Sequence, residues 1–380
     1  MDKLDNDAMV IVGMARTPIG GLLGELKDFS AWQLGGEAIK SAVSRSGLNP
    51  EDIQEVLMGC VLSAGMGQAP ARQAALSAGL PNSVSCTTIN KVCGSGMKAI
   101  MLANPELITV AGGMESMSNS PYLLLKARVG YRAGHAEQIK DHMFLDGLED
   151  AYDRGKLMGV FAENTAKKYN ISREEQDKFA LESLVRAQKS NFKDEISPIG
   201  LIERDELPQR AKPEKIPQLK PVFDPNGTIT AANSSSISDG AAAVVLMSES
   251  EAKKRNIKPI AKIIGSSTHS HDPAWFTTAP VMAIQKLLQK INWDIKDIDL
   301  FEINEAFAVV TLVAMKELKL SHDKVNIHGG ACALGHPIGA SGARIVVTLI
   351  SALQQRGLKR GVASLCIGGG EATALAVEMA

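Results

Sequence analysis

The sequence has few cysteines, and their spacing fits neither disulfides nor zinc. Cys60, Cys86, Cys93, Cys332 and Cys366 are odd in number, and no two of them are spaced as CxxC. A disulfide framework needs an even set at regular spacing, and structural zinc sites favour CxxC pairs. We therefore expect free thiols, some of them reactive, and no metal site.

The sequence also lacks a bias in charge and any long apolar run. It has 41 basic and 42 acidic residues, a formal net charge of −1, and no block of Lys or Arg alternating with aromatics. Nucleic acid is therefore not an expected partner. No uncharged apolar stretch approaches the roughly 20 residues that cross a bilayer, so we expect no membrane association. Met1–Ala8 is acidic and resembles neither a signal peptide nor a transit peptide, which predicts a cytoplasmic location.

Fingerprints of nucleotide-binding loops are missing as well. Gly94-Ser-Gly96 lacks the third glycine that a dinucleotide-binding turn needs, and no other glycine run matches a phosphate-binding loop. We therefore expect neither nicotinamide nor nucleoside triphosphate chemistry. With 380 residues, 45% of them apolar, the chain exceeds the size of a single core and favours two or three associated subdomains.

Short apolar runs alternate with helical patterns along most of the chain. Apolar runs bounded by turn residues are typical of buried strands, whereas apolar positions repeating every three to four residues are typical of helices. Their alternation favours an α/β fold around a mainly parallel sheet. We expect strands at Met9–Val12, Glu55–Val61, Leu107–Ala111, Ala241–Met247, Ala261–Gly265, Leu300–Ile303 and Gly361–Cys366. We expect helices at Ala31–Ser46, Ala162–Ser190, Pro280–Ile291, Ala306–Leu318 and Ser341–Arg356.

Two strand endings resemble each other. Leu107–Glu115 ends in Gly-Gly-Met-Glu and Val362–Glu371 ends in Gly-Gly-Gly-Glu, which suggests two related halves. Ordinary turn chemistry at the end of a strand is the simpler interpretation. Between these endings, Tyr122–Pro225 is rich in charge and proline, and we interpret it as an inserted lobe that ends in a surface loop. Within it, Ser172 and Glu175 fit a capping box at a helix start.

Cys93 lies on a turn bracketed by glycine and followed by a helix-forming segment, in the sequence Asn-Lys-Val-Cys-Gly-Ser-Gly (90–96). A thiol at a helix N-terminus has its thiolate stabilised by free backbone N–H groups and the helix dipole, which lowers its pKa. The motif predicts a nucleophile with a lowered pKa. A small buried core cysteine fits the isolated motif equally well.

Polar residues follow the expected strand that ends at Ile303, in the sequence Asn304-Glu-Ala-Phe-Ala308. The carboxyl ends of strands are where open α/β sheets place their ligand crevices. Asn304 or Glu305 can therefore point into a site. For the isolated motif, an asparagine that caps the next helix is the better interpretation.

A glycine-rich segment with two histidines, residues 328–342, precedes the last expected helix. Imidazole titrates near neutral pH and can accept a proton from a thiol. His336, fixed by Pro337 and flanked by glycine, is the stronger candidate. For His328 we prefer a structural role, with the ring bonded to backbone in a turn.

Cys366 places a second thiol at a strand end, directly before Ile367 and three glycines, 368–370. Successive backbone N–H groups in such a run can form an anion-binding nest. A thiol, with a usual pKa of roughly 8.5, can also act as an acid or base. In isolation, a small buried apolar residue is a competing interpretation.

These four blocks, taken together and in this order, resemble the signature blocks of thiolases, specifically of the acetyl-CoA acetyltransferase (acetoacetyl-CoA thiolase) type. The resemblance covers nearly the whole chain. It includes the further blocks Ala15–Gly20, Gly67–Gln73, Ala111–Met117 and Ala232–Gly240.

The resemblance implies a five-layered α-β-α-β-α fold of two related βαβαβαββ halves with an inserted loop domain. We expect the N-terminal half at 1–120 plus 238–260, the inserted loop and CoA-binding domain at 121–237, and the C-terminal half at 261–380. The resemblance also implies a homo-oligomer, either a dimer or a dimer of dimers (homotetramer).

The reaction implied is the Claisen condensation of two acetyl-CoA to acetoacetyl-CoA and CoA, with the reverse thiolysis, as part of lipid metabolism. Coenzyme A is then substrate and product, and no cofactor is permanently bound. By resemblance, Cys93 carries the acyl group, His336 takes its proton and Cys366 removes an α-proton from the second acetyl-CoA. His336 and a water held by Asn304 stabilise the enolate oxygen. The backbone N–H groups of Cys93 and Gly368 form a second oxyanion hole.

The resemblance further implies a set of residues along the pantetheine and adenine of CoA, and one beside the acyl group. These are Leu148, Met158, Phe223, Ala231 and Ser235 for the coenzyme, and Phe307 for the acyl group. Leu157 stands where biosynthetic thiolases carry a histidine, which removes one polar contact to the coenzyme.

The chain departs from the family in length after its nucleophile. Cys93 to Ala111 spans 18 positions (111 − 93), fewer than the resemblance implies, and the segment before Pro217 is short too. Either the helix behind Cys93 is short or residues are missing from the chain. A short helix weakens the dipole argument for Cys93.

Three other functions fit parts of the same pattern. A ketoacyl synthase shares the fold type, but its decarboxylating condensation needs no base like Cys366, so we disfavour it. A catalytically silent acyl-CoA-binding protein is disfavoured because all four proposed catalytic side chains are present. A 3-ketoacyl-CoA thiolase of broader chain length, acting in β-oxidation, stays open, as does the direction of the reaction.

Overall fold

The α/β alternation expected from the sequence is present in the computed structural model, which describes residues 7–131, 133 and 139–380. The strands are β1 Met9–Arg16, β2 Gly20–Gly21, β3 Glu55–Gly59, β4 Ser85–Ile89, β5 Thr109–Ser116, β6 Tyr122–Leu123, β7 Lys140–Asp141, β8 Ser238–Ser248, β9 Ala261–Ser270, β10 Leu300–Ile303, β11 Arg360–Ile367 and β12 Glu371–Met379. The helices are α1 Ala31–Ser46, α2 Pro70–Ser77, α3 Ser95–Leu102, α4 Met158–Tyr169, α5 Arg173–Lys189, α6 Glu206–Arg210, α7 Glu249–Lys254, α8 Ala279–Ile291, α9 Ala308–Leu318, α10 Ala331–Leu334 and α11 Ile338–Arg356.

The main sheet is mixed, with the strand order β10-β11-β12-β9-β1-β8-β5-β3-β4. Among the strand pairs of the described residues, only β10–β11, β3–β5 and β3–β4 are parallel. The expectation of a mainly parallel sheet is therefore wrong. The reason lies in connections such as β11 to β12, where the chain reverses through Gly368–Gly370 and no helix crosses over. Antiparallel neighbours need only such a turn, whereas parallel ones need a long crossover.

The two halves of this sheet repeat one pattern. β5 pairs in parallel with β3 and antiparallel with β8, while β11 pairs in parallel with β10 and antiparallel with β12. The two similar sequence endings thus lie on equivalent strands. A short antiparallel pairing of Val10 and Ile11 in β1 with Ala261 and Lys262 in β9 joins the halves.

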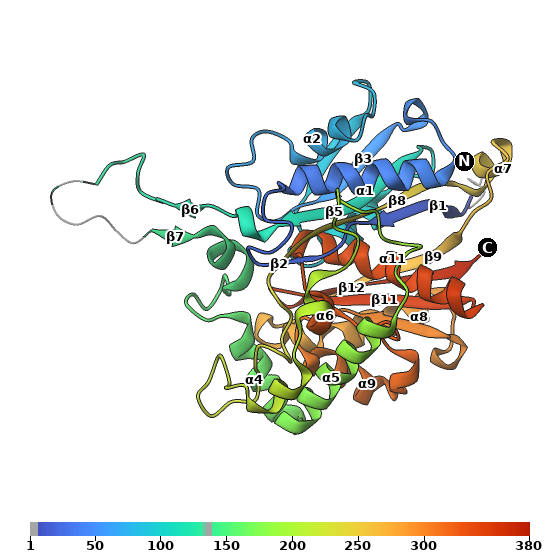
Figure 1. Ribbon diagram of the computed structural model, residues 1–380. Helices are drawn as coiled ribbons and strands as arrows, with labels where there is room; N and C mark the ends of the chain where they lie inside the picture. The colour runs from blue at the N-terminus through green and yellow to red at the C-terminus, as the bar shows by residue number, and fades with distance from the viewer. Residues whose placement is uncertain (1–6, 132, 134–138) are drawn as a thin grey trace.

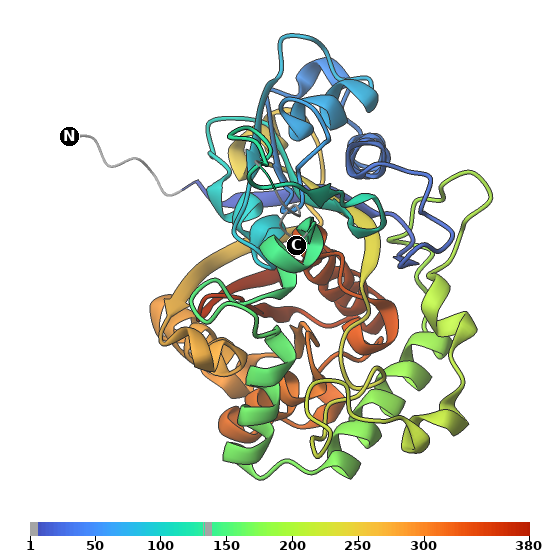
Figure 2. The same ribbon diagram turned by 90° about the vertical axis from the view of Figure 1, so that its left-hand side faces the viewer.

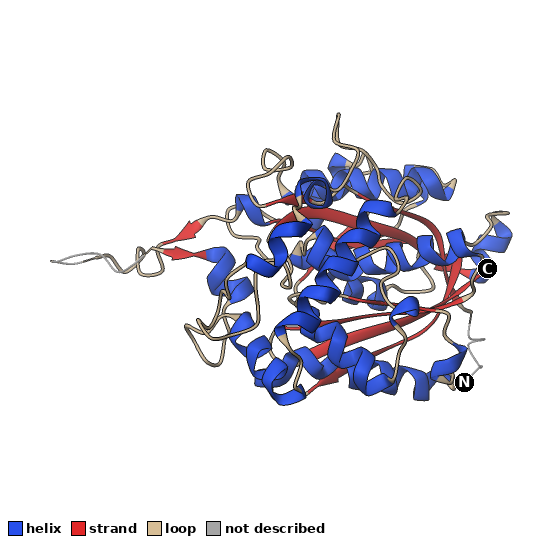
Figure 3. Ribbon diagram, turned by 60° about the horizontal axis from the view of Figure 1, so that its bottom comes forward, coloured by secondary structure: helices blue, strands red, loops and turns tan. Residues whose placement is uncertain are grey.

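Helices and strands stack in layers (Figures 1 and 3). α1 and α2 cover the outer face of the N-terminal strands, and α8 and α9 belong to the outer layer of the C-terminal half. α3 and α11 lie between the two sets of strands, because they contact each other and α11 contacts strands of both sets, β5 and β8 on one side and β10 and β11 on the other. This is the five-layered arrangement expected from the sequence.

Two glycines bring α3 and α11 into backbone contact. A Cβ added to Gly96 would lie 2.8 Å from the backbone N of Ala343, and one added to Gly342 would lie 2.4 Å from the backbone N of Met97. Real Cβ atoms do not approach backbone so closely. Because both positions are glycine, the middle layer is thin, and the site at its edge receives residues from both halves.

A long segment between β5 and β8 leaves the layered body. β6 and β7 lie out to one side, while α4 and α5 run along the outside of the C-terminal half and α6 packs against β2, α5 and α10 (Figures 1 and 2). The predicted single helix Ala162–Ser190 is two helices, because Asn170 takes the left-handed conformation (φ 51°) and ends α4. The capping box is confirmed: Ser172 Oγ accepts from Glu175 N, and Ser172 N donates to Glu175 Oε2. None of the helices in the described ranges is long and apolar enough to span a membrane.

Candidate active site

Cys93 lies in the turn between β4 and α3, two residues before the helix starts. Side chains of the turn hold it: Asn90 Oδ1 accepts from Val92 N at 3.0 Å, and Ser95 Oγ accepts from Lys91 N at 2.8 Å. Val92 takes a positive φ of 45°, so the turn is tight immediately before the cysteine. The thiol is half-buried at the end of an eight-residue helix.

The predicted lowering of the Cys93 pKa is wrong. Burial raises the pKa of Cys93 to about 11, although hydrogen bonds from the backbone N–H groups of Gly368 and of Cys93 itself lower it. The nearby Glu115 carboxylate raises it further. The lowering of the Cys93 pKa by N–H groups at the start of the helix is thus smaller than the rise caused by removing the thiol from water. At neutral pH the thiol is protonated, and nucleophilic attack requires a base.

Cys366 lies beside Cys93, at the end of β11. It is fully buried, and burial together with the neighbouring Cys93 raises its pKa well above the ordinary value. The turn around Cys93 packs directly on this strand end, because a Cβ on Gly94 would lie 2.4 Å from Ile367 Cδ1. The structure therefore brings Cys93, Cys366 and the N–H of Gly368 together.

His336 is buried in the segment before α11 and is held by Ser341. Its Nδ1 lies 2.5 Å from Ser341 Oγ, which itself lies 3.0 Å from the carbonyl oxygen of Pro337. When the hydroxyl donates to Pro337, Nδ1–H donates to Ser341 and the lone pair is on Nε2. Nε2 is buried and has no partner among the described residues. Burial, and then the charge of Arg344, lowers the pKa of His336 to about 3, so the ring is neutral.

Asn304 follows β10 and is almost completely buried. Its Oδ1 accepts a hydrogen bond from Arg344 Nη2 at 3.4 Å, while its Nδ2 finds no partner in the described part of the chain. The interpretation preferred for the isolated motif, an asparagine capping the next helix, is wrong, because α9 begins at Ala308 and its N-cap is Phe307. The amide therefore presents a free donor.

Four of the six predicted substrate-contact residues lie near this cluster or near each other. Leu148 packs in the same apolar cluster as Cys93, and Met158 Sδ lies 3.5 Å from the position of a Cβ on Gly368. Phe223 and Phe307 meet edge to face, with ring centroids 6.1 Å apart.

The other two predicted contacts lie on the loop that leads into β8. Ser235 N donates to the carbonyl oxygen of Ala306 at 3.0 Å, which ties this loop to the segment after Asn304. Ala231 lines a cavity of about 350 Å³ together with Lys212 and Lys215. Leu157 is the N-cap residue of α4, and its apolar side chain makes no capping bond.

Sequence reasoning missed several residues that hold the cluster. Ser341 bonds His336, Arg344 bonds Asn304 and Glu302, and Glu115 accepts N–H groups from Val61, Leu62 and Gly339. Arg344 had a signal, because it is the only charged residue between Pro337 and Leu353. A single charge in an apolar helix indicates a buried partner.

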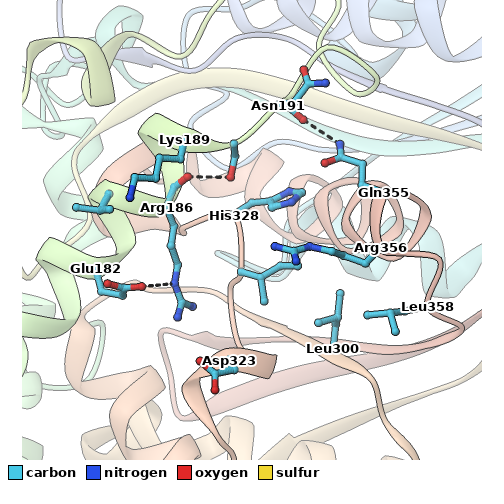
Figure 4. A pocket seen from close by; sticks show the side chains of 13 residues that line it. Glu182, Arg186, Lys189, Asn191, Leu300, Asp323, His328, Gln355, Arg356 and Leu358 are labelled. Carbon is cyan, nitrogen blue, oxygen red and sulfur yellow. Dashed lines mark hydrogen bonds and ion pairs between the residues drawn. The ribbon is translucent and has the colours of Figure 1, made fainter.

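His328, the second histidine of the glycine-rich segment, lies elsewhere. It lines a cavity of about 660 Å³ between α5 and the end of α11, with Arg186 and Lys189 on one side and Arg356 on the other (Figure 4). The expected bond from its ring to backbone is absent in the described structure. Its Nδ1 is buried without a partner, and the ring packs edge-on against Phe192. None of the predicted catalytic residues lines this cavity.

No group of three or more His, Cys, Asp or Glu residues within the described ranges is arranged to hold a metal ion. The chemistry available is that of two thiols, a neutral imidazole, an amide donor and two backbone N–H groups. Such a set can transfer a proton and an acyl group and can stabilise an oxyanion.

Comparisons with known proteins agree along the whole chain. Residues 9–250 match the family model described as "Thiolase, N-terminal domain", and residues 257–379 match "Thiolase, C-terminal domain". A "Probable acetyl-CoA acetyltransferase" of Dictyostelium discoideum is 49% identical over 391 residues, covering 98% of this chain and 94% of the relative. That span exceeds the length of this chain, so the relative has internal residues that are missing here.

Solved structures are similar in fold as well as in sequence. The crystal structure of the Bacillus anthracis acetyl-CoA acetyltransferase superposes with a TM-score of 0.95 at 42% identity, over 98% of this chain and 99% of that one. A thiolase from Ascaris suum in complex with coenzyme A superposes with a TM-score of 0.92 at 42% identity, over 98% and 100% of the two chains.

Proposed function

The chain belongs to the thiolase family and is an acyltransferase, and on that premise we propose that it is an acetyl-CoA C-acetyltransferase. It condenses two acetyl-CoA to acetoacetyl-CoA and CoA, and it catalyses the reverse thiolysis. The observation that carries this proposal is that two thiols, Cys93 and Cys366, lie near each other, with the N–H of Gly368 bonded to the Cys93 sulfur and the Cys93 turn packed on Ile367. One thiol is enough for acyl transfer. Forming a carbon–carbon bond also needs a base that removes an α-proton from the second thioester.

In the first half of the proposed reaction, Cys93 is acylated. Its thiol is protonated at neutral pH, and His336 Nε2, neutral and unpartnered, accepts the proton. The Cys93 sulfur attacks the thioester carbonyl, and the N–H groups of Cys93 and Gly368 bind the oxyanion. The carbon–sulfur bond of acetyl-CoA then breaks, and His336 returns the proton to the departing CoA thiolate.

In the second half, a new carbon–carbon bond forms. Burial keeps the Cys366 thiol protonated at neutral pH, so His336 first takes its proton, and the resulting thiolate takes an α-proton from the second acetyl-CoA. Protonated on both nitrogens, His336 donates Nδ1–H to Ser341 Oγ and Nε2–H to the enolate oxygen, which Asn304 also stabilises through a water. The enolate carbon attacks the acyl group on Cys93, and the Cys93 sulfur leaves as a thiolate that takes the proton back from His336.

The CoA substrates run along Leu148, Met158, Phe223, Ala231 and Ser235 in this proposal, with the acyl group beside Phe307. The contacts of Leu148 with the Cys93 cluster and of Met158 with Gly368 support this path. Coenzyme A is substrate and product and is not a resident cofactor.

Purified protein tests the proposal directly. It should release CoA thiol from acetyl-CoA, and acetoacetyl-CoA absorbance should fall when CoA is added. Mass spectrometry of protein quenched during turnover should find one acetyl group on Cys93. Cys93→Ser should abolish turnover, whereas Cys86→Ser, which changes a half-buried thiol on β4, should not. A wild-type protein without turnover would leave a silent acyl-CoA-binding protein as the function.

Acyl-chain length stays open within the family, as does the direction of the reaction. We propose a preference for acetyl and acetoacetyl groups, since the segments 366–371 and 328–341 resemble the short-chain branch. A comparison of the cleavage rates of acetoacetyl-CoA and of longer 3-ketoacyl-CoA distinguishes a short-chain thiolase from a thiolase of broader chain length. Faster cleavage of the longer substrates would identify a broad 3-ketoacyl-CoA thiolase.

The organisation of the chain beyond the site is also a proposal. We propose that 121–237 form the inserted CoA-binding domain between the halves 1–120 plus 238–260 and 261–380. A homodimer, or a dimer of dimers, stays a prediction from the resemblance, and a cytoplasmic location stays a separate prediction. Light scattering of the purified chain measures its assembly.

A further inference from the structure

Arg344 is an unexpected residue for its place in the fold. It lies in α11, in the middle layer between the two sets of strands, and its side chain is only 2% exposed. Every other residue from Pro337 to Leu353 is uncharged. A buried ion pair stabilises a fold no better than a well-packed apolar residue, so stability alone does not explain an arginine here.

The guanidinium of Arg344 joins two residues of one strand end. Nη1 donates to Glu302 Oε1 at 2.9 Å, and Nη2 donates to Asn304 Oδ1 at 3.4 Å. The planar fork holds both acceptors in fixed directions. Glu302 keeps the arginine in place, and Asn304 receives its second bond.

This geometry decides which end of the Asn304 amide faces the site. With Oδ1 bonded to Arg344, Nδ2 points away from the guanidinium, and it is the atom without a partner. If the amide turned over, its NH₂ group would face the N–H groups of Arg344, donor against donor. The arginine thus selects the orientation in which Asn304 donates into the site.

Arg344 also acts on His336, whose Nε2 is the other buried site atom without a partner among the described residues. The charge of Arg344, after burial, lowers the pKa of His336. Other ionisable groups near Arg344 include Glu302, Glu305 and Glu195, each of which interacts with Arg344 or with Glu302, and burial raises the pKa of Glu302 and of Glu305. Arg344 is therefore linked to both side chains proposed to hold the enolate oxygen.

We propose that Arg344 is a positioning residue for the carbon–carbon step, which it serves by holding the Asn304 amide with its donor toward the enolate oxygen. The inference rests on the proposed function.

The role of Arg344 is specific to one half of the reaction. When the α C–H bond breaks and Cys366 takes the proton, the electron pair leaves a negative charge on the thioester oxygen, and Asn304 serves that oxygen. When Cys93 attacks the first thioester, the charge develops at the N–H groups of Cys93 and Gly368. A loss of Arg344 should therefore slow enolisation far more than acylation.

The test measures acylation and enolisation separately in three variants: Arg344→Met, Asn304→Ala and the double variant. Acylation is followed as the burst of CoA released from acetyl-CoA in the first turnover. Enolisation is followed as deuterium uptake from heavy water into the methyl group of acetyl-CoA. We expect Arg344→Met to slow enolisation about a hundredfold, the usual effect of losing one oxyanion donor, with the acylation burst within about threefold of wild type.

The double variant decides whether Arg344 acts through Asn304. If it does, the double variant is no slower in enolisation than Asn304→Ala alone. The inference would be overturned if the rate losses of the two single variants multiplied in the double variant. It would also be overturned if Arg344→Met lost as much rate in acylation as in enolisation. Thr348→Val is the matched control, because Thr348 lies one turn further along α11 and bonds Glu195. It should change neither half.

Folding and function can be told apart. If Arg344→Met does not fold, Arg344→Lys keeps the charge beside Glu302 but cannot hold two acceptors in one plane, and it should show the same imbalance between the halves. An Arg344→Lys protein with both halves intact would overturn the inference. A wild-type protein that performs neither half would contradict the proposed function itself.

Discussion

Cys93 and Cys366 are both thiols whose pKa is raised by burial, but their surroundings differ. The Cys93 sulfur receives two backbone N–H bonds, whereas Cys366 receives one, its own, and lies deeper in the core. A sulfur with more hydrogen-bond donors is the better place for a tetrahedral oxyanion to form beside it. This difference supports different roles for the two thiols.

Cys366→Ala should separate those roles. The variant keeps Cys93, His336 and both backbone donors, so the acylation burst should be close to wild type. Without the base, condensation should fall by at least about a hundredfold, since a general base contributes about 10²–10⁴ in rate. Burst and steady-state assays on one preparation measure both. A variant that condenses at the wild-type rate would remove Cys366 from the mechanism.

Ser341→Ala tests the orientation of His336. The serine holds Nδ1, and a histidine without its orienting partner loses the preferred tautomer. We expect kcat to fall about tenfold to a hundredfold with little change in thermal stability. Ser341→Thr, which keeps the hydroxyl, should recover part of the rate. No difference between alanine and threonine would mean that the hydroxyl is not needed.

At the scale of elements, apolar pattern predicted the cores of helices and strands better than their ends. α1 and β10 have the predicted bounds, because the left-handed Gly47 (φ 75°) ends α1 and polar residues, Asp299 and Asn304, flank β10. β5, β8 and β9 are longer than predicted, since their extra residues are mostly Gly, Ser or Asp and are paired with neighbouring strands. Those residue types do not indicate a strand by themselves; only the partners do.

Glu115 links three of these elements at the edge of the site. Its carboxylate, on β5, accepts N–H groups from Val61 and Leu62 after β3 and from Gly339 at the start of α11. Burial raises its pKa to about 7, although these donors lower it. The folded state therefore holds a proton that the unfolded state, with a pKa near 4.5, has lost.

The raised pKa makes the stability of the protein depend on pH. The Glu115 carboxyl group contributes up to about 3 kcal/mol to the free energy of unfolding below about pH 4.5, and this contribution is lost as pH rises to about 7. Glu115→Gln cannot titrate. The free energy of unfolding of wild type minus that of Glu115→Gln should therefore fall between about pH 5 and pH 7.5, as measured by urea titration. A constant difference would contradict the raised pKa.

At the scale of the whole molecule, the external segment between β5 and β8 is tied to the body by Arg16. This fully buried residue of β1 donates from Nε to Glu195 at 2.6 Å, donates from Nη1 and Nη2 to Asp205, and lies over the ring of Phe192. All three partners belong to the external segment. One guanidinium thus anchors the segment to the sheet.

Arg16→Lys should loosen this anchor. Lysine keeps the charge but loses the two-pronged bond to Asp205, and disrupting a buried pair costs about 3–5 kcal/mol. Urea unfolding should report the loss, and limited proteolysis should cut faster near residues 195–210. Arg255→Lys is the control, because its pairs with Asp52 and Glu251 are partly exposed and should cost about 1 kcal/mol or less. Equal effects would contradict the anchor.

The sequence predicted the layers and proposed the four side chains Cys93, Asn304, His336 and Cys366, but not the residues that hold them. The layers and the roles came from the order of motifs, each of which was ambiguous alone. The bonds of Ser341, Arg344 and Glu115 depend on packing between segments far apart in the chain, which no local pattern encodes. The prediction of a lowered pKa for Cys93 failed for the same reason. The start of a helix was visible in the sequence, but the burial of the thiol was not.

The N–H groups of Cys93 and Gly368 that face the Cys93 sulfur belong to the main chain. Among the standard amino acids only proline lacks such a group, so almost any substitution at either position leaves the donor in place. Genetic drift can remove the thiols, the imidazole or the amide by single changes, but it can hardly remove these two donors. A member of this fold that has lost its nucleophile would therefore still bind thioester oxygens, and inactive descendants would be expected to keep an affinity for acyl-CoA.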